Sequence, residues 1–126
     1  DAIAIDGQWK TAPLKAQFTN SIFWGEGSTV DSEVVAIRQG NDPFSVQFNQ
    51  GLWRMLDIPA SINQSGMING MDPLFELTTG EPVDHNFRLQ PRSPALDVAQ
   101  SSPLTIDLDG KPRNIGIPDL GAFEKQ

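Results

Sequence analysis

The chain has 126 residues, 38% of them hydrophobic, which is enough for one domain with a modest core and too apolar for a disordered tail. Nine basic against sixteen acidic residues give a formal net charge of −7, which opposes binding to nucleic-acid phosphates and to anionic membrane surfaces. The chain has no cysteine, which excludes disulfides, a thiolate nucleophile and cysteine-ligated metal sites.

The start of the chain carries no signal for targeting or for membrane insertion. Asp1-Ala2-Ile3 lacks the basic and then apolar residues that open a signal peptide. No apolar run approaches the roughly 20 residues needed to span a bilayer. We therefore expect no membrane span, and we expect Asp1 to be either the start of a mature protein or a cut in a longer polypeptide.

Short apolar stretches between turn-forming residues predict a β-rich chain. Eleven glycines and ten prolines are spread along the sequence. The segments between them are rich in Val, Ile, Phe or Trp, or alternate between apolar and polar residues. Five stretches of this kind are predicted strands: residues 2–5, 17–24, 33–37, 44–53 and 86–89.

Two stretches also allow a helix. Ser32 is a suitable N-cap and Gly40 a suitable C-cap for a helix over residues 33–39. Three β-branched residues within 33–37 lose rotamer freedom in a helix, so a strand is the favoured interpretation. A second short stretch with helical spacing comprises Leu52, Met55 and Leu56.

A short internal echo indicates a repeat. Residues 18–23, Phe-Thr-Asn-Ser-Ile-Phe, align with residues 48–53, Phe-Asn-Gln-Gly-Leu-Trp, thirty positions later. In a stack of β-coils such residues lie above one another, and an asparagine at a turn bonds its neighbours. The predicted turn residues are Asn20, Asn49 and Asn69. Chance agreement between two half-buried strands is the alternative.

Five small motifs follow one another in the second half of the chain. They are Asp72-Pro73-Leu74-Phe75, Phe87-Arg88-Leu89-Gln90, Ser93-Pro94-Ala95-Leu96-Asp97, Asp107-Leu108-Asp109-Gly110-Lys111-Pro112-Arg113 and Pro118-Asp119-Leu120-Gly121-Ala122-Phe123-Glu124. None of them is a catalytic signature. Their order and spacing are therefore more informative about the fold than about chemistry.

These motifs resemble the C-terminal closing segment of secreted bacterial right-handed parallel β-helix proteins of the pectate-lyase-like kind. In that family a DPLF, a LxxxSPAxD, a DxDGxxR and a PDxGAxE follow one another, and residues 20–25 look like a strand of the last coils. The resemblance implies an all-β chain that forms the C-terminal coils and cap of a β-helix, with short helical turns. Coils would occupy residues 1–75 and the cap residues 76–126. It also implies an extracellular or cell-surface bacterial protein.

Each motif also has a physical interpretation as a turn or a packed apolar pair. Pro73 and Pro94 set the backbone at turns, and Ser93 is a predicted N-cap of a short helix whose Ala95 and Leu96 pack against the end of the last coil. The whole segment is expected to act as a lid over apolar rungs. The residues expected to hold it are Asp72, Pro73, Phe75, Ser93, Pro94, Asp97, Asp107, Asp109, Gly110, Arg113, Asp119, Gly121 and Glu124.

Asp107 and Asp109 are the one candidate pair for a metal, because closely spaced carboxylates suit calcium. An EF-hand loop would need an oxygen ligand where Lys111 stands and a bidentate glutamate where Pro118 stands. A plain turn is therefore favoured, with no metal and no cofactor. Arg113 is predicted to pair with a nearby carboxylate, for which Asp119 and Glu124 are the candidates.

No catalytic constellation is found in the sequence. His85, the only histidine, is predicted to lie in an exposed polar loop rather than to act as a general base. Some lyases with the β-helix fold use a lysine base, an arginine and calcium-bound carboxylates, but no corresponding motif is present. The basic residues available by type alone are Lys10, Lys15, Arg38 and Arg54.

Trp9, Trp24 and Trp53 are candidates for a glycan platform, because aromatic faces stack on sugars. Trp24 and Trp53 lie in the echoed strands, so packing in the core or at a coil edge is favoured for them. Trp9 is the better candidate for exposure.

Three classes of function follow. The first is a non-catalytic part of a β-helix protein that caps the solenoid and contacts upstream coils, a second copy or another subunit. The second is a free-standing carbohydrate-binding module, with polysaccharide as its ligand. The third is part of a polysaccharide lyase or glycoside hydrolase whose catalytic residues lie upstream. We favour the first class.

Overall fold

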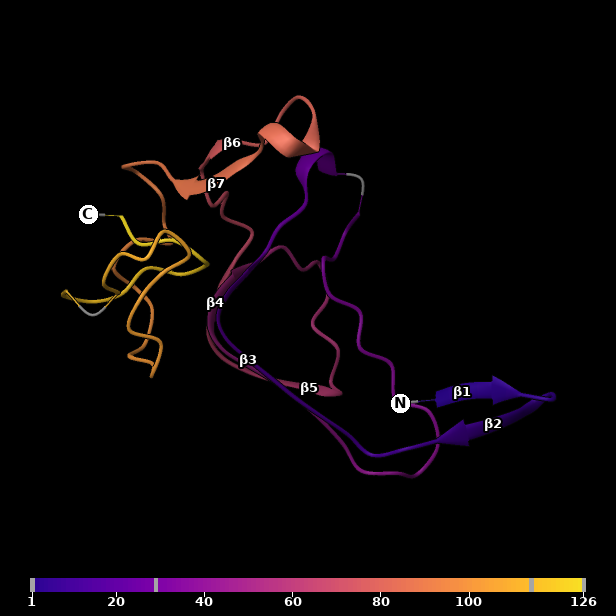
Figure 1. The fold of residues 1–126 in the computed structure, drawn as a ribbon. Coiled ribbons are helices and arrows are strands. Elements are labelled where there is room, and N and C mark those ends of the chain that lie inside the picture. Colours follow the sequence, from indigo (N-terminus) through magenta and orange to yellow (C-terminus); the bar gives the residue numbers. More distant parts are fainter. Residues whose placement is uncertain (1, 29, 114, 126) are drawn as a thin grey trace.

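Three parallel strands form the centre of the protein, whose computed structural model describes residues 2–28, 30–113 and 115–125. Strands β3 (Leu14–Phe23), β4 (Phe44–Trp53) and β5 (Ile62–Asn69) lie side by side in sequence order (Figure 1). Two antiparallel hairpins accompany them, β1 (Ala2–Ile5) with β2 (Gln8–Thr11) and β6 (Phe75–Leu77) with β7 (Asn86–Leu89). The helical elements of the described residues are two 3₁₀ turns, η1 (Glu26–Ser28) and η2 (Pro82–Asp84).

The prediction of an all-β chain is therefore confirmed. The finer prediction of a right-handed parallel β-helix stays a prediction, because the three sheets are separate and the described residues do not close into a complete coil. The strands predicted at residues 2–5, 44–53 and 86–89 have the bounds of β1, β4 and β7. The strand predicted at 17–24 begins three residues earlier and ends one residue earlier, as β3.

The thirty-residue echo is the register of the sheet. Phe18 pairs with Phe48, and Ile22 pairs with Leu52, so the aligned residues lie directly beside one another on β3 and β4. A proline precedes each of these strands, at positions 13 and 43. The echo is therefore structural and not a coincidence between two unrelated strands.

All three strands bend at the same level. The residues at the bend have positive φ: 54° at Asn20, 54° at Gln50 and 64° at Gly66. Asn20 is one of the predicted turn residues, but its counterpart in β4 is Gln50 rather than the neighbouring Asn49. Asn69 lies at the end of β5, where its amide bonds the backbone N–H and C=O of Met55, both at 2.9 Å.

The bend gives the sheet a concave and a convex face, each with its own apolar cluster. The concave cluster is built from Val46, Phe48, Trp53, Met55 and Ile62. On the convex side Leu52 is buried with Leu89, Ala95, Ala99 and Leu120, and Ile22 and Ile68 pack beside it. The curvature is visible in Figure 1, where the chain after β7 lies outside the curve.

The closing segment, defined here as residues 90–125, is attached to the bend itself. The Gly121 N–H donates to the Asn20 carbonyl at 2.8 Å. The Asn20 amide bonds both backbone groups of Gln100, at 2.7 and 3.0 Å, and the Gln50 amide donates to the Val98 carbonyl at 2.7 Å. The segment thus packs against the side of the sheet, over the apolar side chains of Ile22, Leu52 and Ile68. That it caps the end of a coil stays a prediction.

Two local predictions are wrong. Residues 33–39 form neither a strand nor a helix. Both edges of β4 are already paired, with β3 and with β5, so β4 cannot pair with this segment. A single bridge between Ser32 and Met55 tethers its start. The helix predicted after Ser93 is only a turn, although the Ser93 hydroxyl does accept a hydrogen bond from the Ala95 N–H at 3.1 Å.

Three strands were not predicted: β2, β5 and β6. In β5 the sequence Ile-Asn-Gln-Ser-Gly-Met-Ile-Asn carries a run of polar residues, and four consecutive residues of the strand are exposed. Such a strand forms because its backbone completes the ladder of β4, which no apolar pattern in its own sequence indicates.

Leu52 is the residue on which the convex cluster depends, and its truncation tests this packing. Leu52→Ala should lower the free energy of unfolding by about 2–5 kcal/mol, because it removes a fully buried side chain and leaves a cavity. Leu56→Ala, at a leucine that is 72% exposed, should change it by less than about 0.5 kcal/mol. Urea unfolding followed by tryptophan fluorescence measures both, and equal effects would contradict the assignment.

Candidate functional site

Five polar residues of the closing motifs are buried and bond backbone groups: Ser93, Asp107, Arg113, Asp119 and Glu124. The Asp107 carboxylate accepts three N–H donors: those of Asp109 and Lys111 at 2.8 Å on Oδ1, and that of Glu124 at 2.9 Å on Oδ2. Burial raises the pKa of Asp107, but these three donors outweigh it and hold the pKa below its ordinary value. This carboxylate therefore ties the turn to the last strand-like residues of the chain.

Asp119 has the same role at a neighbouring turn. Its Oδ1 accepts the N–H of Asp97 and its Oδ2 accepts the N–H of Lys125, both at 2.8 Å. Asp97 has a φ of 53°, so the aspartate at the end of the Ser-Pro-Ala-Leu-Asp motif occupies a left-handed position. Two motifs that are distant in sequence are thus joined through a single buried side chain.

Arg113 is the buried cation of this network. Its Nη1 donates to the Gly121 carbonyl at 2.9 Å and its Nη2 to the Asp119 carbonyl at 2.7 Å. Its Nε lies 3.9 Å from Glu124 Oε2, so the predicted pairing with Glu124 is present, while Asp119 is contacted through its backbone. Glu124 Oε2 also accepts the Asp119 N–H at 3.2 Å.

The first closing motifs hold the entry to this segment. Asp72 accepts the N–H of Leu74 at 2.8 Å, and Leu74 has a φ of 53°. The Ser93 hydroxyl donates to the Pro73 carbonyl at 2.5 Å, and Pro73 is fully buried. Phe75 stacks edge-on against Phe87 at 5.3 Å between ring centres. These contacts position the chain at the entry to the segment.

The candidate calcium ligands are engaged by the protein itself. Asp109 faces Arg88, whose Nε and Nη2 donate to it at 3.0 and 2.5 Å. The hydrogen bond from Arg88 is the main cause that lowers the pKa of Asp109. Within the described ranges no group of three or more His, Asp or Glu side chains is placed to hold a metal ion. The geometry is that of a plain turn.

The candidate catalytic side chains do not converge. His85 follows η2, half-buried, with its ring 5.8 Å from that of Phe87. Arg54 bonds Glu33 at 2.5 Å and lies over the Trp24 ring, 4.9 Å from its centre. The other basic candidates are exposed: Lys10, Lys15 and Arg38.

The three tryptophans do not share a platform. Trp9 is 63% exposed on the β1–β2 hairpin, as expected. Trp53 is fully buried in the concave cluster, so its ring is not accessible to a sugar and it is excluded as a glycan-binding residue. Trp24 is half-buried and follows the end of β3.

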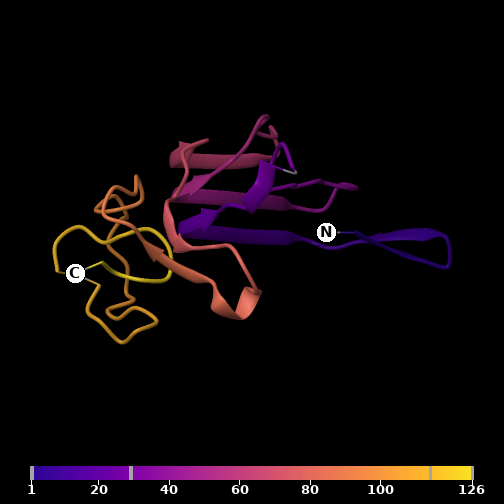
Figure 2. The same ribbon diagram turned by 90° about the horizontal axis from the view of Figure 1, so that it is seen from above.

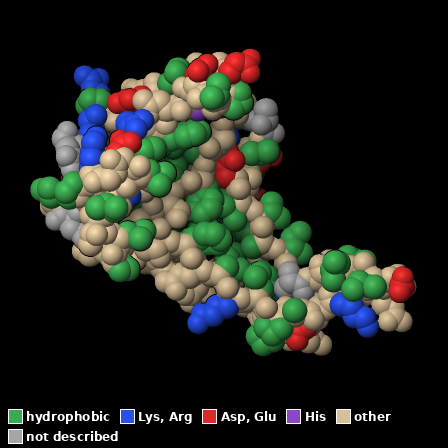
Figure 3. Space-filling model, in the orientation of Figure 1, with side chains coloured by type: hydrophobic (Ala, Val, Ile, Leu, Met, Phe, Trp, Pro, Cys, Tyr) green, Lys and Arg blue, Asp and Glu red, His purple; other side chains and the backbone are tan. Residues whose placement is uncertain are grey.

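One apolar surface is left open along the concave side of β3. Phe18 is 38% exposed, although its ring stacks on Phe48 with 4.8 Å between centres. With Leu14, Ala16 and Phe23 it lines a hollow of about 370 Å³ facing residues 34–37. Figure 3 shows hydrophobic side chains gathered in the middle of this face of the molecule.

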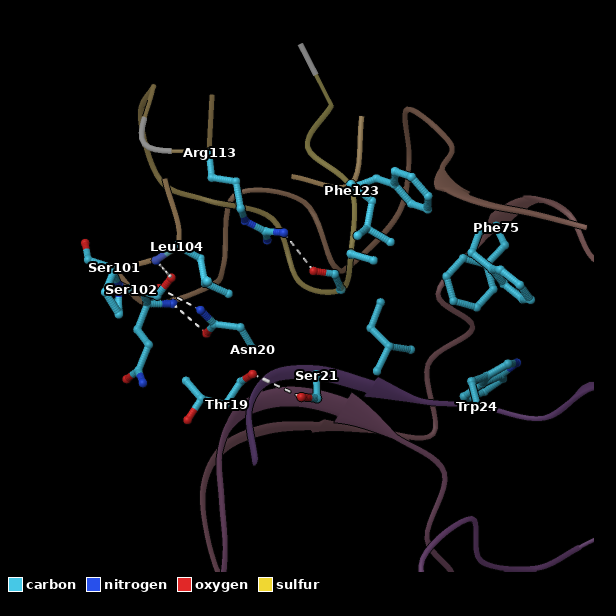
Figure 4. Close-up of a pocket in the computed structure, with 17 residues that line it drawn as sticks. Thr19, Asn20, Ser21, Trp24, Phe75, Ser101, Ser102, Leu104, Arg113 and Phe123 are labelled. Atoms are coloured by element: carbon cyan, nitrogen blue, oxygen red, sulfur yellow. Dashed lines mark hydrogen bonds between the residues drawn. The ribbon is translucent and has the colours of Figure 1, made fainter. Parts of the chain in front are cut away.

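A second opening lies between β3 and the closing segment. It is a groove of about 910 Å³ whose floor is the second half of β3, with Ile22 and Trp24 (Figure 4). Its walls include Leu104 and Phe123 from the closing segment. Sequence reasoning missed this groove, because its walls come from segments far apart in the chain.

The comparisons with known proteins give no further assignment: no family model and no curated protein matches this sequence. In the part of the chain that the structure describes, no helix is long and apolar enough to cross a membrane. The candidate functional surfaces are therefore the hollow on the concave side of β3 and the groove between β3 and the closing segment.

The buried network predicts a specific pH dependence at Glu124. Burial raises the pKa of Glu124, and the neighbouring carboxylates of Asp119 and Asp107 add to the rise. The folded state therefore holds this proton more tightly than the unfolded chain. The stabilisation is complete below the ordinary glutamate pKa and is lost as pH rises through the raised value.

Glu124→Gln removes this titration. The free energy of unfolding of the original chain, relative to the variant, should decrease between about pH 4 and about pH 7. Urea unfolding at several pH values measures the difference. Glu81→Gln, at an exposed glutamate, is the control and should follow the original chain. A constant difference between Glu124→Gln and the original chain over this range would contradict the prediction.

Proposed function

We propose that this chain is the closing part of a parallel β-stack, of the right-handed β-helix kind that its motifs resemble. Its function is to bind a further coil along β3, and it is not itself catalytic. The closing motifs support an extracellular or cell-surface bacterial setting. The structure of the closing segment supports a holding role, since its polar residues bond backbone groups rather than converge on a substrate site.

The proposal rests on one observation: the outer edge of β3 is unpaired and the ring of Phe18 beside it is partly exposed. Phe18 stacks on Phe48 from one side only, and β3 pairs with β4 alone among the described strands. A strand with unpaired edge groups and exposed aromatic and aliphatic side chains is a template for another strand. At the register that joins β3 to β4, a strand added beyond β3 would bring one side chain beside Phe18 and another beside Ile22.

The opposite edge of the sheet has a different character. The exposed residues of β5 include Asn63, Gln64 and Ser65, which offer no apolar surface to a further strand. A further strand on β5 would bury less apolar surface than one on β3. The stack would therefore continue beyond β3 and end at β5. A coil of the same polypeptide fits this better than a second copy, because a two-fold dimer would pair β3 with itself in antiparallel orientation.

Glycan binding is a second candidate, and it depends on the exposure of Trp9 alone. Its ring lies on the β1–β2 hairpin, which projects from the rest of the molecule in Figures 1 and 2. A glycan-array screen of the chain and of Trp9→Ala tests it. Binding that Trp9→Ala abolishes would support it, and an array without binding would remove it.

Repetition of one coil tests the proposed stack. A second copy of residues 14–43, inserted directly before Leu14, should raise the urea midpoint and the denaturant slope of unfolding. The added strand would pair with β3 at the thirty-residue register, and each stacked unit adds interface and buried surface. Urea unfolding of the extended chain measures both quantities.

The control is the same insertion with Phe18→Asp in the added copy. This change places an unpaired charge beside Phe18 of β3, so the variant should gain little stability. If the in-register insertion leaves both quantities unchanged, or prevents folding, the proposed function is wrong.

A further inference from the structure

The closing segment and the β6–β7 hairpin extend past the sheet on one side. Figure 2 shows β6, β7, η2 and some of the closing segment beyond β3, on the side away from β4. Thr78, between β6 and η2, donates to Glu26 after β3 at 2.8 Å. The chain that covers the convex face therefore overhangs the open edge of β3.

The groove continues an interface that already exists inside the chain. The ladder aligns Ile22, Leu52 and Ile68 in one column on the convex face, and the closing segment packs on this column. Ile22 is the last member of the column, and it also belongs to the groove floor. The position beyond Ile22, where the next member of the column would lie, is the groove itself.

The walls of the groove have the chemistry of a packing surface. Leu104 is 68% exposed and Leu108 is 77% exposed, although both lie beside the groove, where aromatic rings of Phe87 and Phe123 also line it. Arg113 is the one charged residue among the described lining residues, and its guanidinium is already bonded to two backbone carbonyls. The described lining residues thus include no carboxylate, and their one cation is already engaged within the protein.

We propose that the closing segment and the β6–β7 hairpin form a clasp for the coil that binds β3. The branched aliphatic side chain of that coil, at the position equivalent to Ile22, seats in the groove against Leu104, Leu108 and Phe123. This inference rests on the proposed function, since it requires a coil on β3. It adds that the closing segment holds the incoming coil on its outer side while Phe18 contacts its inner side.

The extended chain with the in-register copy of residues 14–43 provides the test. In the inserted copy alone, Ile22→Asp should remove most of the gain in urea midpoint, because it places a carboxylate against apolar side chains, and the guanidinium of Arg113, the one cation of the groove, is already engaged within the protein. The control is Val35→Asp in the same copy, at a position that is 76% exposed in the original coil. It should keep the gain.

A proximity measurement makes the test independent of stability. The chain has no cysteine, so Leu108→Cys combined with Ile22→Cys in the inserted copy gives a single pair of thiols. A short bifunctional maleimide should cross-link this pair, and it should not cross-link Leu108→Cys with Val35→Cys in the copy. Cross-linking of the first pair only is the expected result.

The outcomes separate the two proposals. If the inserted coil raises stability but Ile22→Asp in the copy has no effect and the thiols do not react, the clasp is wrong and the stack stands. If the insertion itself fails, the stack is wrong and the clasp falls with it. Binding of a soluble oligosaccharide that Leu104→Asp abolishes in the original chain would assign the groove to a ligand and overturn the clasp.

Discussion

The column of left-handed residues at the bend is the constraint on which the rest of the structure depends. Asn20, Gln50 and Gly66 adopt positive φ at the same level of three adjacent strands, so the whole sheet turns there. Asparagine tolerates this conformation better than most residues, and glycine adopts it freely. The side chains of Asn20 and Gln50 then reach residues 98–100 and fasten the closing segment to the convex face. At Gly66 a side chain would collide with the Gln50 amide, so glycine is needed there.

In the closing segment, buried carboxylates accept hydrogen bonds from backbone N–H groups that a neighbouring strand would bond in a sheet. Most of the chain after β7 is irregular, and the backbone groups of its buried residues require partners. Asp107 and Asp119 together accept five N–H donors, and Arg113 donates to two carbonyls. Each polar residue thus satisfies several backbone groups that no strand can reach. This explains why aspartate, serine and arginine recur in these motifs.

What could be predicted from the sequence was local or repeated. Phe18 and Phe48 indicated the register because the same pattern occurs twice, and the polar neighbours of Trp9 indicated its exposure. Residues 33–37 have the composition of a strand, but they bond residues 54–61 rather than the edge of a sheet. Strand β5 pairs with the edge of β4 although its sequence is polar. The groove beside Ile22 could not be predicted, since its walls meet only through the tertiary contacts of Gly121 and Gln100 with Asn20.

A cap was expected both to hold the strands together and to cover the end of the stack. The position of the closing segment separates these two roles. An end cap would cover the last strand, but here the segment lies on the side of the sheet and overhangs the first of the three strands, β3. At the other end, β5 presents polar residues of its own, with Asn63 and Gln64 on opposite faces of the strand. A segment that covers the column from Ile68 to Ile22 couples all three strands, so it opposes their separation one by one. The part of the segment that overhangs β3 would couple an added coil to the same three strands. The clasp and the exposed Phe18 would then contact the same coil and form one interface.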